Sequence, residues 1–283
     1  LVGSEMCIRD RLGEPPGLDA VEVNSALTGA EWALPASTLD AFDQGNFDQG
    51  WGSLEQSWES QWSRYFGKNL SSDRPRDLAS VRDRLTVLAQ ETGSRTEIVY
   101  ITLQPQQIDL IAITPEGEPI YRRVEVDRSA VLQAAEDLRS TITNPVLRNG
   151  QNYLKPAQAL DRWLIQPITA ALGDRHIDTL LLSLDAGLRS VPIAALHDGQ
   201  KFLVQRYALG ITPSLSLTDT SYKNLSQAPV LAMGASEFLS QNPLPAVPIE
   251  LQTIASHRRQ GHYLLNADFT VQNPPAKLPG GSF

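Results

Sequence analysis

The chain has 283 residues, of which 41% are hydrophobic and 20% charged, a composition that argues against wholesale disorder. Its formal charge of −8, with no Lys/Arg-rich stretch to offset it, makes nucleic acid and anionic membranes poor partners. The sequence has neither an apolar run of about 18 residues nor an apolar signal core at its start, so we predict a cytoplasmic protein.

The chain contains one cysteine, Cys7, which excludes an internal disulfide and a thiolate metal cluster. The opening LVGSEMCIRDR has neither a helical nor a strand period, and it resembles translated adapter DNA. We therefore interpret residues 1–11 as a non-native scar and leave them out of the fold. On this interpretation the native part of the chain has no cysteine.

Residues 12–90 are predicted to be a helical region. Within residues 45–67, large apolar side chains recur at steps of three and four, which places them on one face of an amphipathic helix. They are Trp51, Leu54, Trp58, Trp62, Tyr65 and Phe66. Such a stripe could stack on a ligand, but packing against a neighbouring helix or domain is the favoured interpretation. A second helix is predicted over Leu78–Leu88.

The pattern then changes to period two, in runs predicted to be strands over residues 96–103, 108–114 and 120–126. The turn at residues 115–119, with Gly117 able to take a positive φ, joins the last two into an antiparallel meander. A helix follows over residues 129–142, with Asp127 available as its cap. Another is predicted over residues 156–172, and Pro167 should bend it or split it after Ile165.

From residue 177 onwards strands and helices alternate, which predicts an α/β sheet between helices. The continuous apolar run at 177–184 is typical of a strand covered on both faces, and further strands are predicted at 203–211 and 229–235. Helices are expected to begin at Pro213–Ser214 and near Pro248. Residues 261–273 should hold a short strand and a helix start capped by Thr270 or Asp268. The tail 274–283 has no periodic pattern, and whether it is native stays open.

Few residues carry recognisable chemistry. No phosphate-binding or dinucleotide-binding glycine loop is present. Ser236, in Gly234-Ala-Ser-Glu-Phe238, follows a predicted strand but lacks the second glycine of a nucleophile elbow. A structural role, with Gly234 turning the chain and Ser236 capping a helix, is favoured over a nucleophilic one.

The four histidines, His176, His197, His257 and His262, have no metal-binding spacing, so we predict no metal site. His197 and Asp198 stand next to each other at a turn and are interpreted as structural. Asp185 and Arg189 flank the tight turn DAGLR. A semi-buried ion pair between them is favoured over an anion site.

Five ordered segments resemble the CHAT domain, a caspase-like domain associated with TPR repeats. The stretch Leu180–Thr218 resembles the first half of that domain, and the resemblance covers most of residues 40–275. The matching elements are the L-R-x-V-P run (Leu188, Arg189, Val191, Pro192), the HDG…TPS segment with Pro213 and Ser214, VLAMGASEF, LPAVPIEL with Glu250 as the helical glutamate, and HYLLNADFT.

The resemblance implies a fold like that of caspases and separase, and cysteine peptidase activity by a His/Cys dyad in which a base lowers the thiol pKa. The family's H-[LF]-A-[TS]-H-G motif should follow LLN-x-x-FT, where this sequence reads QNPPAKLPGGSF. Cys7 lies at the wrong end, and His257 and His262 precede the expected position. No catalytic, cofactor-binding or metal-binding residue is therefore carried over, and no cofactor is predicted.

We therefore expect an α/β, caspase-like sheet flanked by helices, preceded by a β-meander lobe and an N-terminal helical segment, and truncated at the C-terminus. The predicted domains are the scar 1–11, the helical region 12–90, which could hold the end of a TPR-type segment and lead-in helices, and a partial CHAT domain over 91–283. The expected parent is a caspase-like cysteine endopeptidase, of which this chain is a catalytically incomplete fragment. The alternative is a non-catalytic scaffold. Protein partners or a protein substrate are expected, with TPR repeats upstream in the parent, and neither nucleic acid nor membrane.

Overall fold

The computed structural model describes residues 33–67, 69, 77–144, 146–147, 150–172, 175–218, 228, 230–256 and 261–268, with the side chains of residues 65 and 66 excepted. The chain divides into two compact units between Ser221 and Tyr222, and each is considered by itself. Several predictions lie outside the described residues: the scar at 1–11 with Cys7, His257, the cap Thr270 and the tail.

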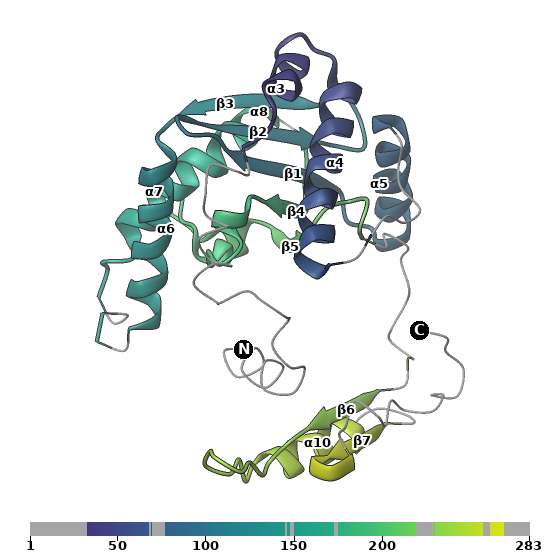
Figure 1. Cartoon of the computed structure of the whole chain (residues 1–283), viewed down its shortest axis with the longest axis vertical. Coiled ribbons are helices and arrows are strands. Elements are labelled where there is room, and N and C mark those ends of the chain that lie inside the picture. The colour runs from purple at the N-terminus through teal and green to yellow at the C-terminus, as the bar shows by residue number, and fades with distance from the viewer. Residues whose placement is uncertain are drawn as a thin grey trace. The chain divides into compact units, whose positions relative to one another are not determined.

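The first unit is built on a five-stranded sheet with the order β3-β2-β1-β4-β5 (Figure 1). Its strands are β1 (Thr96–Leu103), β2 (Gln107–Ile113), β3 (Ile120–Glu125), β4 (Thr179–Leu184) and β5 (Ala208–Thr212). The first three are antiparallel neighbours, whereas β4 pairs parallel with β1 and β5 parallel with β4. The sheet is therefore mixed.

The predicted meander is present, but it is not a lobe of its own. Strand β1 is shared by the two halves of the sheet, because Val99 is in register with Ala112 of β2 on one side and with Leu182 of β4 on the other. Every residue of β1 is buried. A strand that is paired on both edges and covered on both faces joins the meander and the parallel strands into one core.

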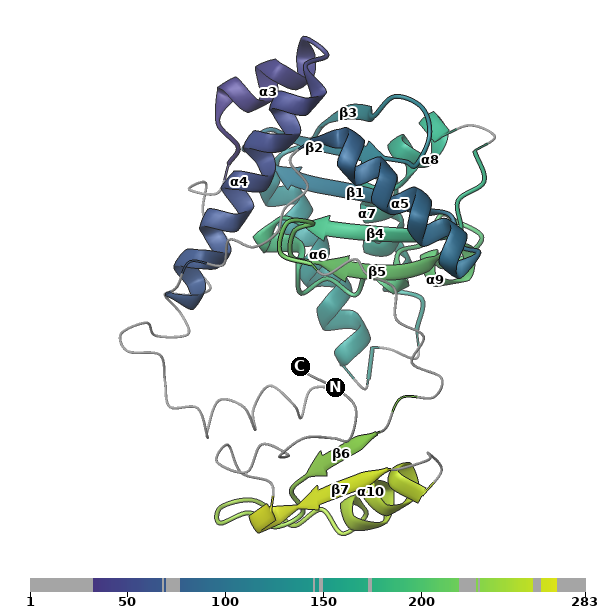
Figure 2. The ribbon, with the colours of Figure 1, turned by 90° about the vertical axis from the view of Figure 1, so that its right-hand side faces the viewer.

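Helices cover both faces of this sheet (Figure 2). On one face lie α3 (Ala36–Asp43), α4 (Phe47–Phe66) and α5 (Leu78–Thr92), and on the other lie α6 (Arg128–Thr143), α7 (Leu154–Leu164) and α8 (Gln166–Leu172). The short helix α9 (Leu203–Arg206) and the 3₁₀ turns η2 (Ala186–Leu188) and η3 (Ile193–Ala195) lie in the connections. The predicted break after Ile165 is confirmed, since α7 ends at Leu164 and α8 begins at Gln166.

The aromatic stripe of α4 forms part of the core, as the packing interpretation predicted. Trp51, Leu54 and Trp58 are 2%, 0% and 2% exposed, and they share a hydrophobic cluster with Ile98 and Tyr100 of β1. The favourable transfer of such large side chains from water holds the helical layer on the sheet.

Two local predictions in this unit are wrong. Residues 203–206 form α9 rather than the start of a strand, because the side chain of Gln205 accepts the backbone N–H of Phe202 at 2.8 Å and caps a helical turn there. Pro213 and Ser214 begin no helix. The backbone N–H groups of Leu215 and Ser216 donate to Glu55, and the segment continues as a turn in which the N–H of Thr218 donates to the carbonyl oxygen of Leu215 at 3.2 Å.

The second unit contains a two-stranded parallel sheet of β6 (Leu231–Gly234) and β7 (His262–Leu265), with α10 (Val247–Ser256) packed against it and the 3₁₀ turn η4 (Asn266–Asp268) after β7. The prediction that residues 177–184 form a strand covered on both faces is confirmed by β4, which lies between β1 and β5 and packs against both hydrophobic clusters. Of the strand predicted at 229–235, residues 231–234 form β6, whose strand partner among the described residues is β7. None of the described helices is both long and apolar enough to cross a membrane.

Candidate functional site

The carboxyl ends of three parallel strands meet at one edge of the five-stranded sheet. These ends are Leu103 of β1, Leu184 of β4 and Thr212 of β5. In open α/β sheets, ligands bind in the crevice outside such carboxyl ends. The polar side chains at this edge therefore form the candidate functional site of the first unit.

A buried ion pair stands directly after β4. Arg128, the first residue of α6, donates from Nη2 to Asp185 Oδ1 at 3.1 Å and from Nη1 to the carbonyl oxygen of Leu103 at 2.6 Å. The carboxylate of Asp185 also accepts the backbone N–H groups of Gly187 at 3.0 Å and of Leu103 at 3.3 Å. The two side chains are 9% and 4% exposed, so this charge pair is shielded from water and its hydrogen bonds tie β1, β4 and α6 together.

The predicted pair between Asp185 and Arg189 is wrong, because Arg128 takes that place. Arg189 donates from Nε to the carbonyl oxygen of Leu184 at 3.2 Å, and its guanidinium lies 4.4 Å from the centre of the Trp62 ring. In the described part of the chain, its buried Nη2 has no hydrogen-bond partner. Burial lowers the pKa of Arg189, and the nearby charge of Asp185 opposes that shift.

A second buried polar cluster holds the loop after β5. Glu55 of α4 is 5% exposed, and its carboxylate accepts the hydroxyl of Tyr100 at 2.6 Å and that of Ser214 at 2.7 Å. It also accepts the backbone N–H groups of Leu215 at 3.1 Å and Ser216 at 3.0 Å. Burial, followed by the charge of Glu55, raises the pKa of Tyr100 well above its usual value, so the phenol stays a donor.

The hydroxyls at this edge are already used in structural hydrogen bonds. Ser183, which is 0% exposed, donates to the carbonyl oxygen of Pro213 at 3.3 Å, and Ser214 is bonded to Glu55 and to Ser216. Within the described part of the chain, no histidine lies beside them in a hydrogen bond. A nucleophile needs a base within hydrogen-bond reach, and the described residues of this edge do not provide that pair.

The structural interpretation of His197 and Asp198 is confirmed. Nδ1 of His197 accepts the backbone N–H of Gly199 at 2.9 Å, while Asp198 accepts those of Gln200 and Lys201 at 2.7 Å each. These backbone hydrogen bonds, with that from Lys201 first, lower the pKa of Asp198. The hydrogen bonds of the two side chains thus hold the backbone of this turn.

The other described histidines form no site either. His176 is 78% exposed and lies 2.9 Å from Asp178, and His262 is an exposed residue of β7. Among the described residues, no three His, Cys, Asp or Glu side chains lie close enough together to share a metal ion.

Ser236, the candidate nucleophile in the second unit, is bonded to an asparagine. Asn266 Oδ1 accepts the backbone N–H of Ser236 at 2.7 Å, and Asn266 Nδ2 lies 3.0 Å from Ser236 Oγ. Asn266 takes a positive φ of 52°, a region that asparagine tolerates better than most residues. Ser236 therefore joins the ends of β6 and β7, and the prediction that it caps a helix is wrong.

Sequence reasoning missed Glu55 and Arg128. A signal for Glu55 exists, because a carboxylate four residues after Trp51 stands on the apolar face of α4, where a charge is unexpected. Arg128 gave no signal, since the first residue of a helix is an ordinary place for a charged side chain. Its partner Asp185 lies 57 positions away.

Residues 154–277 match the family model of the CHAT domain. The chain contains a CHAT domain. The match begins at α7, includes β4, β5, β6 and β7, and confirms the resemblance inferred from the sequence. CHAT domains are caspase-like, and the mixed sheet flanked by helices is consistent with that fold. No curated protein matches the chain.

Proposed function

We propose that this chain is the structural framework of a caspase-like cysteine endopeptidase and does not itself supply the catalytic dyad. The observation that carries the proposal is the CHAT domain together with the edge where β1, β4 and β5 end in a buried polar network. Arg128, Asp185 and Glu55 fix the loops at this edge. A rigid edge of this kind is what a peptidase needs in order to hold a dyad and a peptide in register.

The catalytic requirement itself is a thiolate beside a base, since the thiolate and not the thiol is the nucleophile. The sequence offers Cys7 as its cysteine, far from the segments that resemble the CHAT domain. The dyad of the proposed enzyme would therefore be supplied by sequence other than residues 154–277.

A second candidate function is a non-catalytic scaffold that binds a protein partner. One observation favours it: the serine hydroxyls of the carboxyl edge and the imidazole of His197 are all committed to structural hydrogen bonds. An edge whose polar groups are satisfied internally can still present a fixed surface to a protein. A serine hydrolase that uses Ser236 ranks third, because its hydroxyl has an amide rather than an imidazole as neighbour.

The deciding experiment reads the source gene on both sides of this sequence and expresses the whole product. A histidine in an H-x-A-T-H-G strand end and a cysteine after a later apolar strand would support the peptidase. The product should then cleave protein substrates and react with thiol-directed active-site probes, and a Cys→Ser variant should do neither.

The 283-residue chain is the matched control. It should show no hydrolysis, and Cys7→Ser and Ser236→Ala should leave that result unchanged. A gene product without the two motifs, or one that has them and hydrolyses nothing while capturing a protein partner, would decide for the scaffold.

A further inference from the structure

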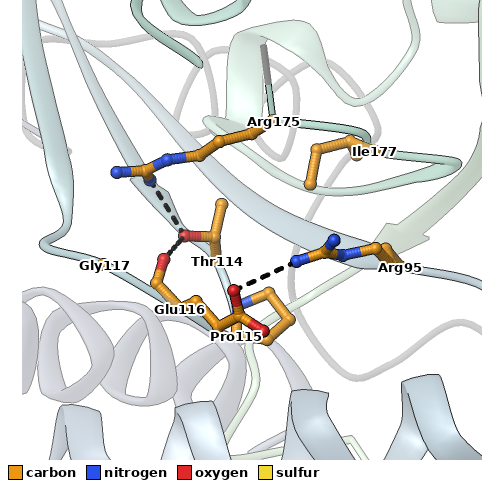
Figure 3. A pocket seen from close by; sticks show the side chains of 7 residues that line it. All are labelled: Arg95, Thr114, Pro115, Glu116, Gly117, Arg175 and Ile177. Atoms are coloured by element: carbon orange, nitrogen blue, oxygen red, sulfur yellow. Dashed lines mark hydrogen bonds and ion pairs between the residues drawn. The ribbon is translucent and has the colours of Figure 1, made fainter. Parts of the chain in front are cut away.

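A pocket opens at the other end of the sheet, where β2 turns into β3 and where β1 and β4 begin. Its volume is about 250 Å³, and it is lined by Arg95, Thr114, Pro115, Glu116, Gly117, Arg175 and Ile177 (Figure 3). The two guanidinium groups reach it from different segments, one just before β1 and the other just before β4. The pocket is separate from the carboxyl edge and shares none of its residues.

Arg175 forms no ion pair with a described carboxylate, although it lies near enough to the buried Glu97 for its charge to act on that carboxyl group. Its Nη1 donates to Thr114 Oγ1 at 3.2 Å, and the hydroxyl of Thr114 in turn donates to the carbonyl oxygen of Glu116 at 2.5 Å. The guanidinium lies directly over Gly117, where a Cβ atom would stand 2.6 Å from Nη2. Gly117 also has a φ of +82°, so both its backbone and the cation above it favour glycine.

Arg95 pairs with the one acidic side chain of the lining. Its Nη2 lies 3.3 Å from Glu116 Oε2, with side-chain exposures of 43% and 82%. Its backbone is fixed, because the N–H of Arg95 donates to Asp178 Oδ2 at 2.9 Å. An ion pair this exposed contributes little to stability, so Glu116 can leave Arg95 at low cost.

The pocket lining thus supplies two guanidinium groups and one displaceable carboxylate, while Glu97 near Arg175 and Asp178 near Arg95 stand behind the lining. A guanidinium presents paired N–H donors that match the oxygens of a phosphate or carboxylate, and such charge-assisted hydrogen bonds are among the stronger ones. A dianion can replace the single charge of Glu116 and use both cations together. The volume leaves room for the group that carries the phosphate as well.

We propose that this pocket binds a phosphate group between Arg95 and Arg175, with Glu116 as the internal competitor that the ligand displaces. The phosphate can be free inorganic phosphate or a phosphorylated side chain, since the chemistry at the two arginines is the same. The formal charge of −8 on the whole chain opposes anions at long range, so the binding depends on these local donors.

The test is a titration of the full chain with inorganic phosphate at constant ionic strength, followed by calorimetry and by the amide resonances of Thr114 and Gly117. We expect saturable binding that shifts both resonances. Arg175→Gln and Arg95→Gln should each weaken binding about tenfold or more, and Glu116→Gln should tighten it several-fold. Arg122→Gln is the matched control, because Arg122 is an exposed arginine of β3 bonded to the carbonyl oxygen of Tyr121, and it should bind like the parent chain.

Equal responses to chloride and phosphate, or unchanged affinity in both arginine variants, would overturn the proposal. The Arg95→Gln variant should fold like the parent chain, because the Arg95 side chain is 43% exposed and its loss leaves the core intact. Weaker phosphate binding by this variant therefore reports on the pocket and not on misfolding. A phosphoserine peptide titrated in parallel separates the sources. If the peptide binds more tightly than inorganic phosphate, the ligand is a phosphorylated protein. If it binds equally or more weakly, the ligand is the free ion.

Discussion

The carboxylate of Glu55 accepts a hydrogen bond from the hydroxyl of Ser214 at 2.7 Å, although 159 positions separate the two residues. The same carboxylate accepts the backbone N–H groups of Leu215 and Ser216 and the hydroxyl of Tyr100. One side chain of α4 thus satisfies four buried donors from β1 and from the loop after β5. The helical layer and the CHAT-domain loop depend on each other through this residue.

Replacing Glu55 by alanine should destabilise the first unit by about 3 kcal/mol, because it leaves several buried donors without an acceptor. The measurement is the free energy of unfolding in urea. Glu91→Ala is the control, since Glu91 is an exposed glutamate of α5 and its loss should change stability by less than about 0.5 kcal/mol. Equal effects of the two substitutions would mean that Glu55 is not the anchor of this loop.

The buried pair of Arg128 and Asp185 gives a second prediction. Arg128→Met leaves the carboxylate of Asp185 buried without its cation, at a cost of about 3 kcal/mol or more. Adding Asp185→Leu should cost less than the sum of the single changes, because it removes the unpaired charge. A double-mutant cycle should therefore give a coupling energy above about 1 kcal/mol.

The matched control for this cycle is the ion pair of Arg139 and Glu136 on α6, whose side chains are 51% and 54% exposed. Its coupling energy should stay below about 0.5 kcal/mol. A coupling of that size for the buried pair would show that Arg128 and Asp185 act independently, for instance through their separate hydrogen bonds to Leu103 and Gly187.

The elements most accurately predicted from sequence are those with a strong local pattern. The strand over residues 96–103 and the break after Ile165 agree with the structure, because a run rich in β-branched and aromatic residues and an internal proline act within a few positions. The loop at residues 213–218 was predicted incorrectly because its conformation is set by Glu55. A local pattern cannot report a partner 160 positions away.

The site shows the same limit. The sequence placed Asp185 and Arg189 at a tight turn, and the structure places this turn directly after β4, at the carboxyl edge of the sheet. The sequence paired them wrongly because nearness in the chain favoured Arg189, whereas the fold brings the first residue of α6 onto the end of β4. The two-arginine pocket was missed for the same reason, since Arg95 and Arg175 lie 80 residues apart.

The position of β4 in the sheet predicts a contrast between two neighbouring residues. Leu182 of β4 is in register with Ile211 of β5, and their exposures are 0% and 59%. Leu182→Asp should prevent folding, because an unpaired buried charge costs several kcal/mol. Ile211→Asp, on the edge strand, should retain the native far-UV circular dichroism. A folded, monomeric Leu182→Asp variant would contradict the central placement of β4.

The stability of the first unit should fall as the pH rises, because of Glu97. This residue of β1 is 0% exposed, and neither of its buried carboxyl oxygens has a hydrogen-bond partner among the described residues. Burial raises its pKa from 4.5 to about 8, against the opposing charge of Arg175. Between those two pH values the unfolded chain releases a proton that the folded chain keeps, so the unfolded state is favoured progressively.

The contribution of Glu97 to the free energy of unfolding is therefore fully present below pH 4.5, and it is lost as the pH rises to about 8. One proton corresponds to a slope of up to about 1.4 kcal/mol per pH unit. Glu97→Gln should remove that slope in urea unfolding measured across this range, whereas Glu91→Gln, at an exposed position, should keep it. Burial also raises the pKa of Asp161, so the decisive quantity is the difference between the parent chain and Glu97→Gln. Parallel pH profiles for the parent chain and Glu97→Gln would mean that the pKa of Glu97 is the same in the folded and the unfolded chain.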